Sequence, residues 1–150
     1  MGPPAKSKLE FATLPANAFS LGLAVRFLSQ YPPFADFKLG KAVKAITQQI
    51  GAGHHLVGAI DDQLKAYLGW VRTDTELAEA WIAGSRRLTA KAEGAAIAVT
   101  MLAVDDPALI FPMIREAKRR NLGVAVYWKR LYTGGRPAKF KVVRKRGDIQ

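Results

Sequence analysis

The sequence predicts an α/β protein in which helices flank a mixed central sheet, with two helices at the N-terminal end. Apolar residues recur at helical spacing in the first third of the chain, and short β-like runs follow from residue 55. The run 95–104 is apolar almost without interruption. At 150 residues the chain has the size of one domain. We therefore expect an irregular N-terminal arm over residues 1–17 and a single domain over residues 18–150.

The first two helices are predicted from the spacing of their apolar residues. Over residues 19–28 these recur three and four positions apart, with Ser20 as a candidate N-cap. Pro32-Pro33 then stops the helix. A second amphipathic helix is expected over residues 39–50, with lysines on its outer face.

A β-hairpin and a third helix are predicted next. Residues 55–60 and 66–71 form two β-like runs, separated by a segment that contains Asp61-Asp62-Gln63. Aspartate tolerates left-handed and turn geometry, so this segment fits a hairpin turn. A helix containing residues 77–82 follows.

The second half of the chain is predicted to complete the sheet. The apolar run 95–104 suits a strand that is buried on both faces. Asp105-Asp106-Pro107 supplies an N-cap and then a proline at the first helical position, so a helix is expected from there to Asn121. Strands are predicted over residues 124–132 and 140–144.

The charge balance points to an anionic partner. Lys and Arg number 23 against 12 Asp and Glu, a net charge of +11, and residues 115–150 carry twelve basic and two acidic residues of these totals. Such a distribution is typical of proteins that meet nucleic acid, an anionic membrane or a strongly acidic protein.

Composition also excludes several classes of protein. The chain has no cysteine, which excludes disulfides, thiolate catalysis and cysteine-ligated zinc. No apolar run approaches the roughly 18–20 residues of a membrane helix, and no apolar region directly follows the N-terminal lysines. We therefore expect no membrane span, no signal peptide and a cytoplasmic location.

Short segments between residues 20 and 145 resemble one family of enzymes. They are Leu21-Gly22, Phe27-Leu28-Ser29, Pro32-Pro33-Phe34, Gly53-His54-His55-Leu56-Val57, Tyr67-Leu68-Gly69-Trp70-Val71, Leu102-Ala103-Val104-Asp105, Lys129-Arg130-Leu131 and Gly135-Arg136-Pro137-Ala138-Lys139. In their order along the predicted elements they resemble the RTX toxin-activating lysine acyltransferases, which belong to the GNAT acyltransferase superfamily. The resemblance implies a GNAT-like mixed sheet and transfer of a fatty acyl group from acyl carrier protein to a lysine of a protein substrate.

The chain departs from that family at its catalytic positions. The family's catalytic histidine follows the proline turn, where this chain has Phe34-Ala35-Asp36, and its catalytic aspartate corresponds to Thr100. Phenylalanine cannot act as a general base, and threonine is a poor one. The usual GNAT pyrophosphate loop, Gln/Arg-x-x-Gly-x-Gly/Ala, is missing between Val104 and Ile110. We therefore expect no bound cofactor, with the acyl donor carried on acyl carrier protein.

Four residues are candidates for catalysis. Imidazole titrates near pH 6.5, so His54 or His55 is suited to act as the base. Neighbouring residues on a strand point to opposite faces, so at most one of the two can face a cleft, and without a third ligand we expect no metal site. Thr100 replaces the family aspartate, and Asp105 follows the buried strand, where α/β sheets commonly bind ligands. The structural alternatives are a polar pair at a strand entry and an ordinary helix cap.

The basic end of the chain is the candidate partner-binding surface. Its members are Arg115, Lys118, Arg119, Arg120, Lys129, Arg130, Arg136 and Lys139. Acyl carrier protein is acidic, so this surface is suited to dock it. Tyr127, Trp128 and Tyr132 lie among the charges, and aromatics beside arginines also hold single-stranded nucleic acid.

Three functions thus remain open from the sequence. They are an acyl-carrier-dependent acyltransferase, an inactive relative that only binds a partner, and a nucleic-acid-binding protein without catalysis. A basic surface over core aromatics would also explain the pattern. An edge strand without cover favours a homodimer.

Overall fold

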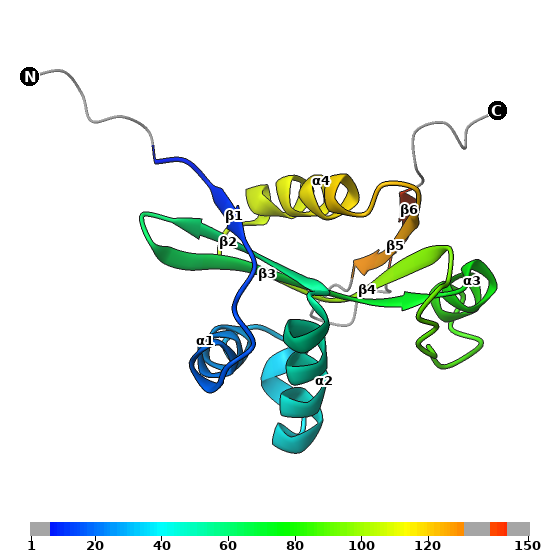
Figure 1. Cartoon of the computed structure of the whole chain (residues 1–150), viewed down its shortest axis with the longest axis horizontal. Helices are drawn as coiled ribbons and strands as arrows, with labels where there is room; N and C mark the ends of the chain where they lie inside the picture. The colour runs from blue at the N-terminus through cyan, green and yellow to red at the C-terminus, as the bar shows by residue number, and fades with distance from the viewer. Residues whose placement is uncertain (1–6, 131–138, 144–150) are drawn as a thin grey trace, which may run out of the picture.

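The computed structural model describes residues 7–130 and 139–143 and has an α+β architecture (Figure 1). Within these residues six strands form one sheet in the order β1-β2-β3-β4-β5-β6. Strands β4 and β5 pair in parallel, and the other neighbouring strands pair antiparallel. The mixed sheet predicted from the sequence is therefore confirmed.

Every predicted helix and strand is present over the residues that the structure describes; residues 131, 132 and 144 of the last two predicted strands lie outside them. The strands are β1 (Glu10–Ala12), β2 (His55–Ile60), β3 (Gln63–Thr73), β4 (Ala96–Val104), β5 (Ala125–Arg130) and β6 (Lys139–Val143). The helices are α1 (Ala18–Leu28), α2 (Leu39–Ala52), α3 (Thr75–Ile82) and α4 (Ile110–Arg120), with 3-10 turns η1 (Phe34–Asp36) and η2 (Pro107–Leu109). Across the described ranges, no helix is long and apolar enough to cross a membrane.

Strand β1 lies within the segment 1–17, which the sequence analysis expected to be irregular. Its residues pair antiparallel with Val57, Gly58 and Ala59 of β2, and Phe11 packs against the core beneath α4. A strand of three residues has no periodicity that a sequence pattern can reveal. It forms because the edge of β2 offers main-chain donors and acceptors to a passing segment.

Local turn chemistry agrees with the sequence in the hairpin and differs at the first helix. Asp61 and Asp62 have φ angles of 52° and 61°, the left-handed pair that a two-residue hairpin turn requires. At α1 the N-cap is Asn17 rather than Ser20, because the Asn17 side chain accepts a hydrogen bond from the Ser20 N–H at 2.8 Å.

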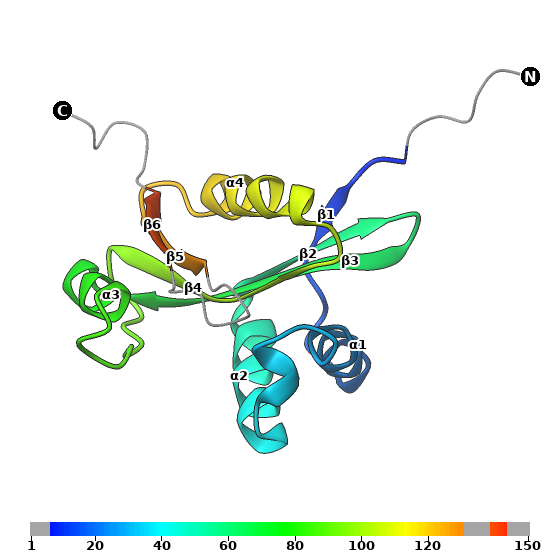
Figure 2. The ribbon, with the colours of Figure 1, turned by 180° about the vertical axis from the view of Figure 1, so that it is seen from behind.

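Helices cover both faces of the sheet. Helix α4 packs on one face, whereas α1 and α2 lie on the other, and α3 lies beside the far end of β3 (Figures 1 and 2). Alternate residues of β2 supply the two cores, since Leu56 packs beneath α4 and Val57 beneath α1 and α2. The central strand β4 also contributes to both cores, Ile97 to the first and Met101 to the second, as its uninterrupted apolar run predicts.

Strand β4 contains a β-bulge at Thr100. Gly69 of β3 pairs with Met101. The next residue of β3, Trp70, pairs with Val99, so Thr100 is the extra residue of the bulge. Bulges disrupt the hydrogen-bonded ladder locally and are frequent beside binding sites.

The same position marks the end of the parallel pairing with β5. The last aligned pair is Val99 with Trp128, although β4 continues to Val104 and β5 continues to Arg130. Among the described pairings, Thr100 therefore has no aligned partner on either side. The two parallel strands separate from this point onward.

Candidate active site

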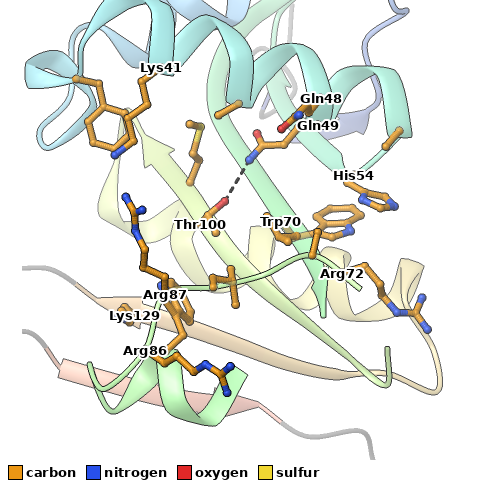
Figure 3. Close-up of a pocket in the computed structure, with 18 of the residues that line it drawn as sticks. Lys41, Gln48, Gln49, His54, Trp70, Arg72, Arg86, Arg87, Thr100 and Lys129 are labelled. Atoms are coloured by element: carbon orange, nitrogen blue, oxygen red, sulfur yellow. Dashed lines mark hydrogen bonds between the residues drawn. The ribbon is translucent and has the colours of Figure 1, made fainter. Parts of the chain in front are cut away.

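A cavity of about 1250 Å³ lies where β4 and β5 separate. Thr100 and Met101 of β4 and Lys129 of β5 contribute to its lining from the sheet. The other walls come from β3, α2, α3 and the loop after α3, and Figure 3 shows α2 facing that loop across the cavity.

A chain of hydrogen bonds runs from the buried Tyr67 through Gln49 to Thr100, and the last two of these residues line the cavity. The Tyr67 hydroxyl donates to Gln49 Oε1 at 2.8 Å, and Gln49 Nε2 donates to Thr100 Oγ1 at 3.1 Å. Burial raises the pKa of Tyr67 far above its ordinary value, so the phenol remains a donor. Because Thr100 Oγ1 accepts from Gln49, its own hydroxyl proton is left to donate to a ligand.

Gly69 makes this arrangement possible. A Cβ atom built on Gly69 would overlap the side-chain amide of Gln49. Any larger residue on this part of β3 would displace the amide from both Tyr67 and Thr100. The hydrogen bonds of Gln49 to Tyr67 and Thr100 therefore depend on a close approach that only glycine allows.

The charged side chains of the cavity are of one sign. Of the described residues that line it, five are basic and none is acidic; the five are Lys41, Arg72, Arg86, Arg87 and Lys129. Lys41, Arg86 and Arg87 form no ion pair within the described part of the chain. A cleft lined by one sign of charge concentrates its potential and attracts counter-ions, so this cavity is suited to an anionic ligand.

Lys129 faces this cavity and not α4. Its ammonium lies 4.2 Å from the centre of the Trp81 ring, and burial lowers the pKa of Lys129. The preceding residue, Trp128, points to the other face and meets Phe111 edge to face at 6.3 Å. These two neighbouring residues of β5 therefore point to opposite faces of the sheet.

The two histidines have different environments. His54 lines the cavity and stacks on Trp70 with ring centres 6.0 Å apart (Figure 3). Burial, and to a smaller extent the charge of Arg72, lowers the pKa of His54, so its imidazole is neutral at pH 7. His55 is buried, and its Nε2 accepts the Leu14 N–H at 2.7 Å. His54 is the histidine that can meet a ligand in this cavity.

Asp105 is not among the residues that line the cavity. Its carboxylate forms an ion pair with Lys65 Nζ at 3.3 Å and accepts a hydrogen bond from the Tyr31 hydroxyl at 3.4 Å. The structure thus brings Thr100 and His54 to one cavity and holds His55 and Asp105 in other contacts.

The turn between β4 and α4 does not fit the pyrophosphate of coenzyme A. Asp106 accepts the Ala108 N–H at 2.9 Å, so the chain's own carboxylate occupies the amide end of η2. Pro107 has no N–H to offer, and Asp105 adds a second negative charge. An anion at a helix start needs free N–H groups and a positive field, and this turn supplies neither.

The basic cluster predicted on α4 is partly neutralised within the helix. Arg119 and Arg120 both bind Glu116, at 2.6 Å and 2.8 Å. The hydrogen bonds from Arg119 are the main reason that the pKa of Glu116 falls to about 2. Arg115 and Lys118 also lie on α4, which covers the face opposite α2 (Figure 2).

The described members of the predicted basic surface therefore lie on two sides of the sheet. Lys129 faces the cavity, whereas the α4 residues lie across the sheet from it. The side chains of Arg130 and Lys139 and the whole of Arg136 lie outside the described residues. Lys129 lies apart from the α4 residues because summing charge along the chain ignores the side of the sheet to which each residue points.

The aromatic residues between these charges belong to the core where they are described. Tyr127 is 0% exposed and Trp128 is 2% exposed, so neither can stack on a nucleic-acid base. Tyr132 lies outside the described residues. The stacking argument for nucleic-acid binding is therefore wrong at Tyr127 and Trp128.

No protein-family model matches the chain, and no curated protein matches its sequence. Solved structures match its fold. The loading GNATL domain of CurA from Lyngbya majuscula matches with a TM-score of 0.58 and 11% identity, covering 87% of this chain and 71% of that one. An agmatine N-acetyltransferase matches with a TM-score of 0.57 and 12% identity over 83% of this chain and 76% of that one.

A third similar structure is the GphF GNAT-like decarboxylase in complex with isobutyryl-CoA. Its TM-score is 0.56 and its identity 16%, over 84% of this chain and 67% of that one. The chain therefore has a GNAT-like fold, as the resemblance implied.

The hydrogen bond to Thr100 makes a prediction about stability. Thr100→Val keeps the shape of the side chain but removes the acceptor of Gln49 Nε2. We expect the free energy of unfolding to fall by about 1–2 kcal/mol, because a buried amide donor loses its partner. In a Gln49→Leu background the same substitution should lower the free energy of unfolding by less than about 0.5 kcal/mol. Urea denaturation of the four proteins measures this, and equal losses in both backgrounds would contradict it.

The ion pairs of Glu116 predict a pH dependence. The pKa of Glu116 lies below its ordinary value of 4.5, so the pairs stabilise the fold above about pH 4.5 and are lost as the pH falls toward 2. Glu116→Gln should lower the free energy of unfolding by about 0.5–1 kcal/mol at pH 7, since the arginines are largely exposed. The difference from the unmodified protein should shrink between pH 4.5 and pH 3. A difference that stays constant over this range would contradict the assignment.

Proposed function

We propose that this protein is an acyltransferase that moves an acyl group from acyl carrier protein to a lysine amine of a protein substrate. The observation that carries the proposal is the cationic cavity at the point where β4 and β5 separate, with Thr100 in its wall. The GNAT-like fold supports the same class of reaction, and one similar structure, the GphF decarboxylase, holds isobutyryl-CoA, an acyl thioester.

The charge of the cavity supports a phosphate-bearing donor. The phosphopantetheine arm of acyl carrier protein carries a phosphodiester, and the carrier surface around it is acidic. Arg86 and Arg87 are exposed on the loop after α3, where they can meet both the arm and the carrier. Lys41 on α2 supplies positive charge from the opposite wall (Figure 3).

The β4–α4 turn favours a carrier-bound donor over free coenzyme A. Coenzyme A would bring a pyrophosphate to a turn that already holds Asp105 and the capping Asp106. An acyl-phosphopantetheine arm has no pyrophosphate and avoids this repulsion. This arrangement supports the donor implied by the resemblance to toxin-activating acyltransferases, an acyl group on acyl carrier protein.

His54 is suited to accept the proton of the attacking amine. In the proposed step the amine nitrogen attacks the thioester carbonyl carbon, a C–N bond forms and the C–S bond breaks. The proton leaves the nitrogen for the neutral imidazole of His54 and passes on to the departing thiolate. Neighbouring cations lower the pKa of an entering lysine, which increases the fraction present as free amine.

Thr100 is suited to stabilise the oxyanion. Its hydroxyl proton is left to donate, because Gln49 donates to its oxygen. The bulge at Thr100 also disrupts the main-chain ladder at this point of β4, a geometry suited to present a main-chain N–H to the same carbonyl oxygen. Thr100 thereby takes an electrostatic role at the position where the toxin-activating family has its aspartate.

The proposal predicts which basic residues bind the carrier. Purified protein mixed with acylated carrier protein should release the acyl group from the carrier, and intact-mass spectrometry should find it on a lysine. Arg86→Glu with Arg87→Glu should weaken binding of the acylated carrier at least about tenfold, as measured by fluorescence anisotropy at physiological salt.

The matched control is Arg115→Glu with Lys118→Glu, which reverses two charges on the exposed side of α4. We expect this variant to bind the carrier within about twofold of the unmodified protein. Loss of carrier binding in the α4 variant alone would place the carrier-binding surface on α4 and contradict its assignment to Arg86 and Arg87. Tight binding of generic DNA or RNA without any acyl transfer would favour the nucleic-acid function instead.

The role of His54 makes a separate prediction. His54→Gln should lower kcat by about 10²–10⁴-fold with little change in carrier affinity, because it removes a base and not a docking charge. In the unmodified protein the rate should fall on acidification through a pKa below 6.5, since protonated imidazole cannot accept the proton. His55→Gln serves as the contrast, because a buried structural histidine should affect stability and leave that pKa unmoved.

A further inference from the structure

A second, smaller pocket of about 150 Å³ lies between α1, η1 and α2. Its described lining contains no charged side chain and is apolar except for Ser29; the residues are Val25, Leu28, Ser29, Phe34, Ala35, Phe37, Leu39, Ala42, Ile46 and Met101. The larger cavity also has apolar residues in its lining, but it differs from this pocket in its basic side chains.

The two spaces are neighbours. Phe37 and Met101 line both of them. Met101 directly follows Thr100, so the apolar pocket begins one residue beyond the bulge. Met101 therefore lies at the border between Thr100 and the apolar space, on the path of an alkyl chain attached to a carbonyl carbon at Thr100.

This division of charge fits an amphiphilic ligand. The cavity presents five described basic side chains, whereas the pocket presents aliphatic and aromatic ones. Removing an alkyl chain from water is favourable in proportion to the area buried, and a charged head would remain among the cations.

The size of the pocket limits the chain that fits. A dry cavity of about 150 Å³ lined by Leu, Ile and Phe binds a six-carbon ring such as benzene. Leu39, at the outer end, is 71% exposed, so a longer chain would pass it into water.

Resting on the proposed function, we propose that this pocket binds the alkyl chain of the acyl donor and gives selectivity for chain length up to about six carbons. Each methylene that enters should raise affinity by roughly fourfold, and methylenes beyond the sixth should add little.

The experiment measures binding and transfer over a series of chain lengths. Binding of S-ethyl, S-hexyl and S-dodecyl pantetheine thioethers is measured by calorimetry, and transfer is measured with carrier protein bearing two, six or twelve carbons. We expect the hexyl thioether to bind at least tenfold more tightly than the ethyl one, with the dodecyl one within about threefold of the hexyl one.

Ala42→Leu fills the pocket from α2 with a good helix-forming residue. It should remove the preference for hexyl over ethyl, both in binding and in transfer. Ala18→Leu is the matched control, because Ala18 is exposed on α1 outside the pocket lining, and it should keep the original profile. Phe34→Ala, which enlarges the pocket, should extend the gain in affinity to longer chains.

The outcomes separate the two proposals. Chain-length selectivity that is abolished by Ala42→Leu supports the pocket even when no acyl transfer occurs, in which case the proposed function alone fails. Transfer or binding that is insensitive to chain length, or equally sensitive in Ala42→Leu, overturns the pocket and leaves the acyltransferase proposal standing. Affinity that keeps rising to twelve carbons overturns the six-carbon limit.

Discussion

The loss of strand partners at Thr100 is the constraint on which the site depends. A strand in the middle of a sheet normally has its main chain engaged on both sides. At Thr100 the bulge against β3 coincides with the end of pairing to β5. The first half of β4 stays paired and buried, which holds the position of this break. The cavity exists because the sheet opens there while helices α2 and α3 remain to wall it.

The polar chain behind Thr100 shows how an apolar core tolerates such a break. Gln49 lies on a helix that otherwise buries Ile46 and Ile50, yet its amide has partners at both ends. The buried Tyr67 hydroxyl is the first donor of this chain of hydrogen bonds. A fully satisfied buried network orients its members, whereas a partly satisfied one would be a penalty. The hydrogen bond from Gln49 therefore helps to set the orientation of the Thr100 hydroxyl.

The distribution of charge separates two kinds of basic residue. On α4, Arg119 and Arg120 have Glu116 as an intramolecular counter-ion. Around the cavity, Arg86, Arg87 and Lys41 have no ion-pair partner in the described ranges. Like charges held together repel, and a bound anion relieves that repulsion. The turn before α4 has the reverse arrangement, because carboxylates already occupy it, so anion binding is concentrated at the cavity.

The sequence by itself determined the helices α1 to α4 and five of the six described strands, because periodicity and turn chemistry are local. It indicated that β4 is buried on both faces, that Asp61-Asp62 forms a tight turn, and that at most one of His54 and His55 can meet a ligand. The resemblance singled out Thr100, but nothing local showed that it would lie at a bulge.

Only the tertiary structure decided the site. Lys41, Arg72 and Arg86 come from different elements, so no count along the chain groups them, and the excess of charge after residue 115 drew attention to α4 instead. Strand β1 and the apolar pocket were likewise invisible, since each is formed by segments that meet only after folding. Local patterns specify which face of an element is apolar, whereas a site depends on which elements are brought together and where the sheet between them opens.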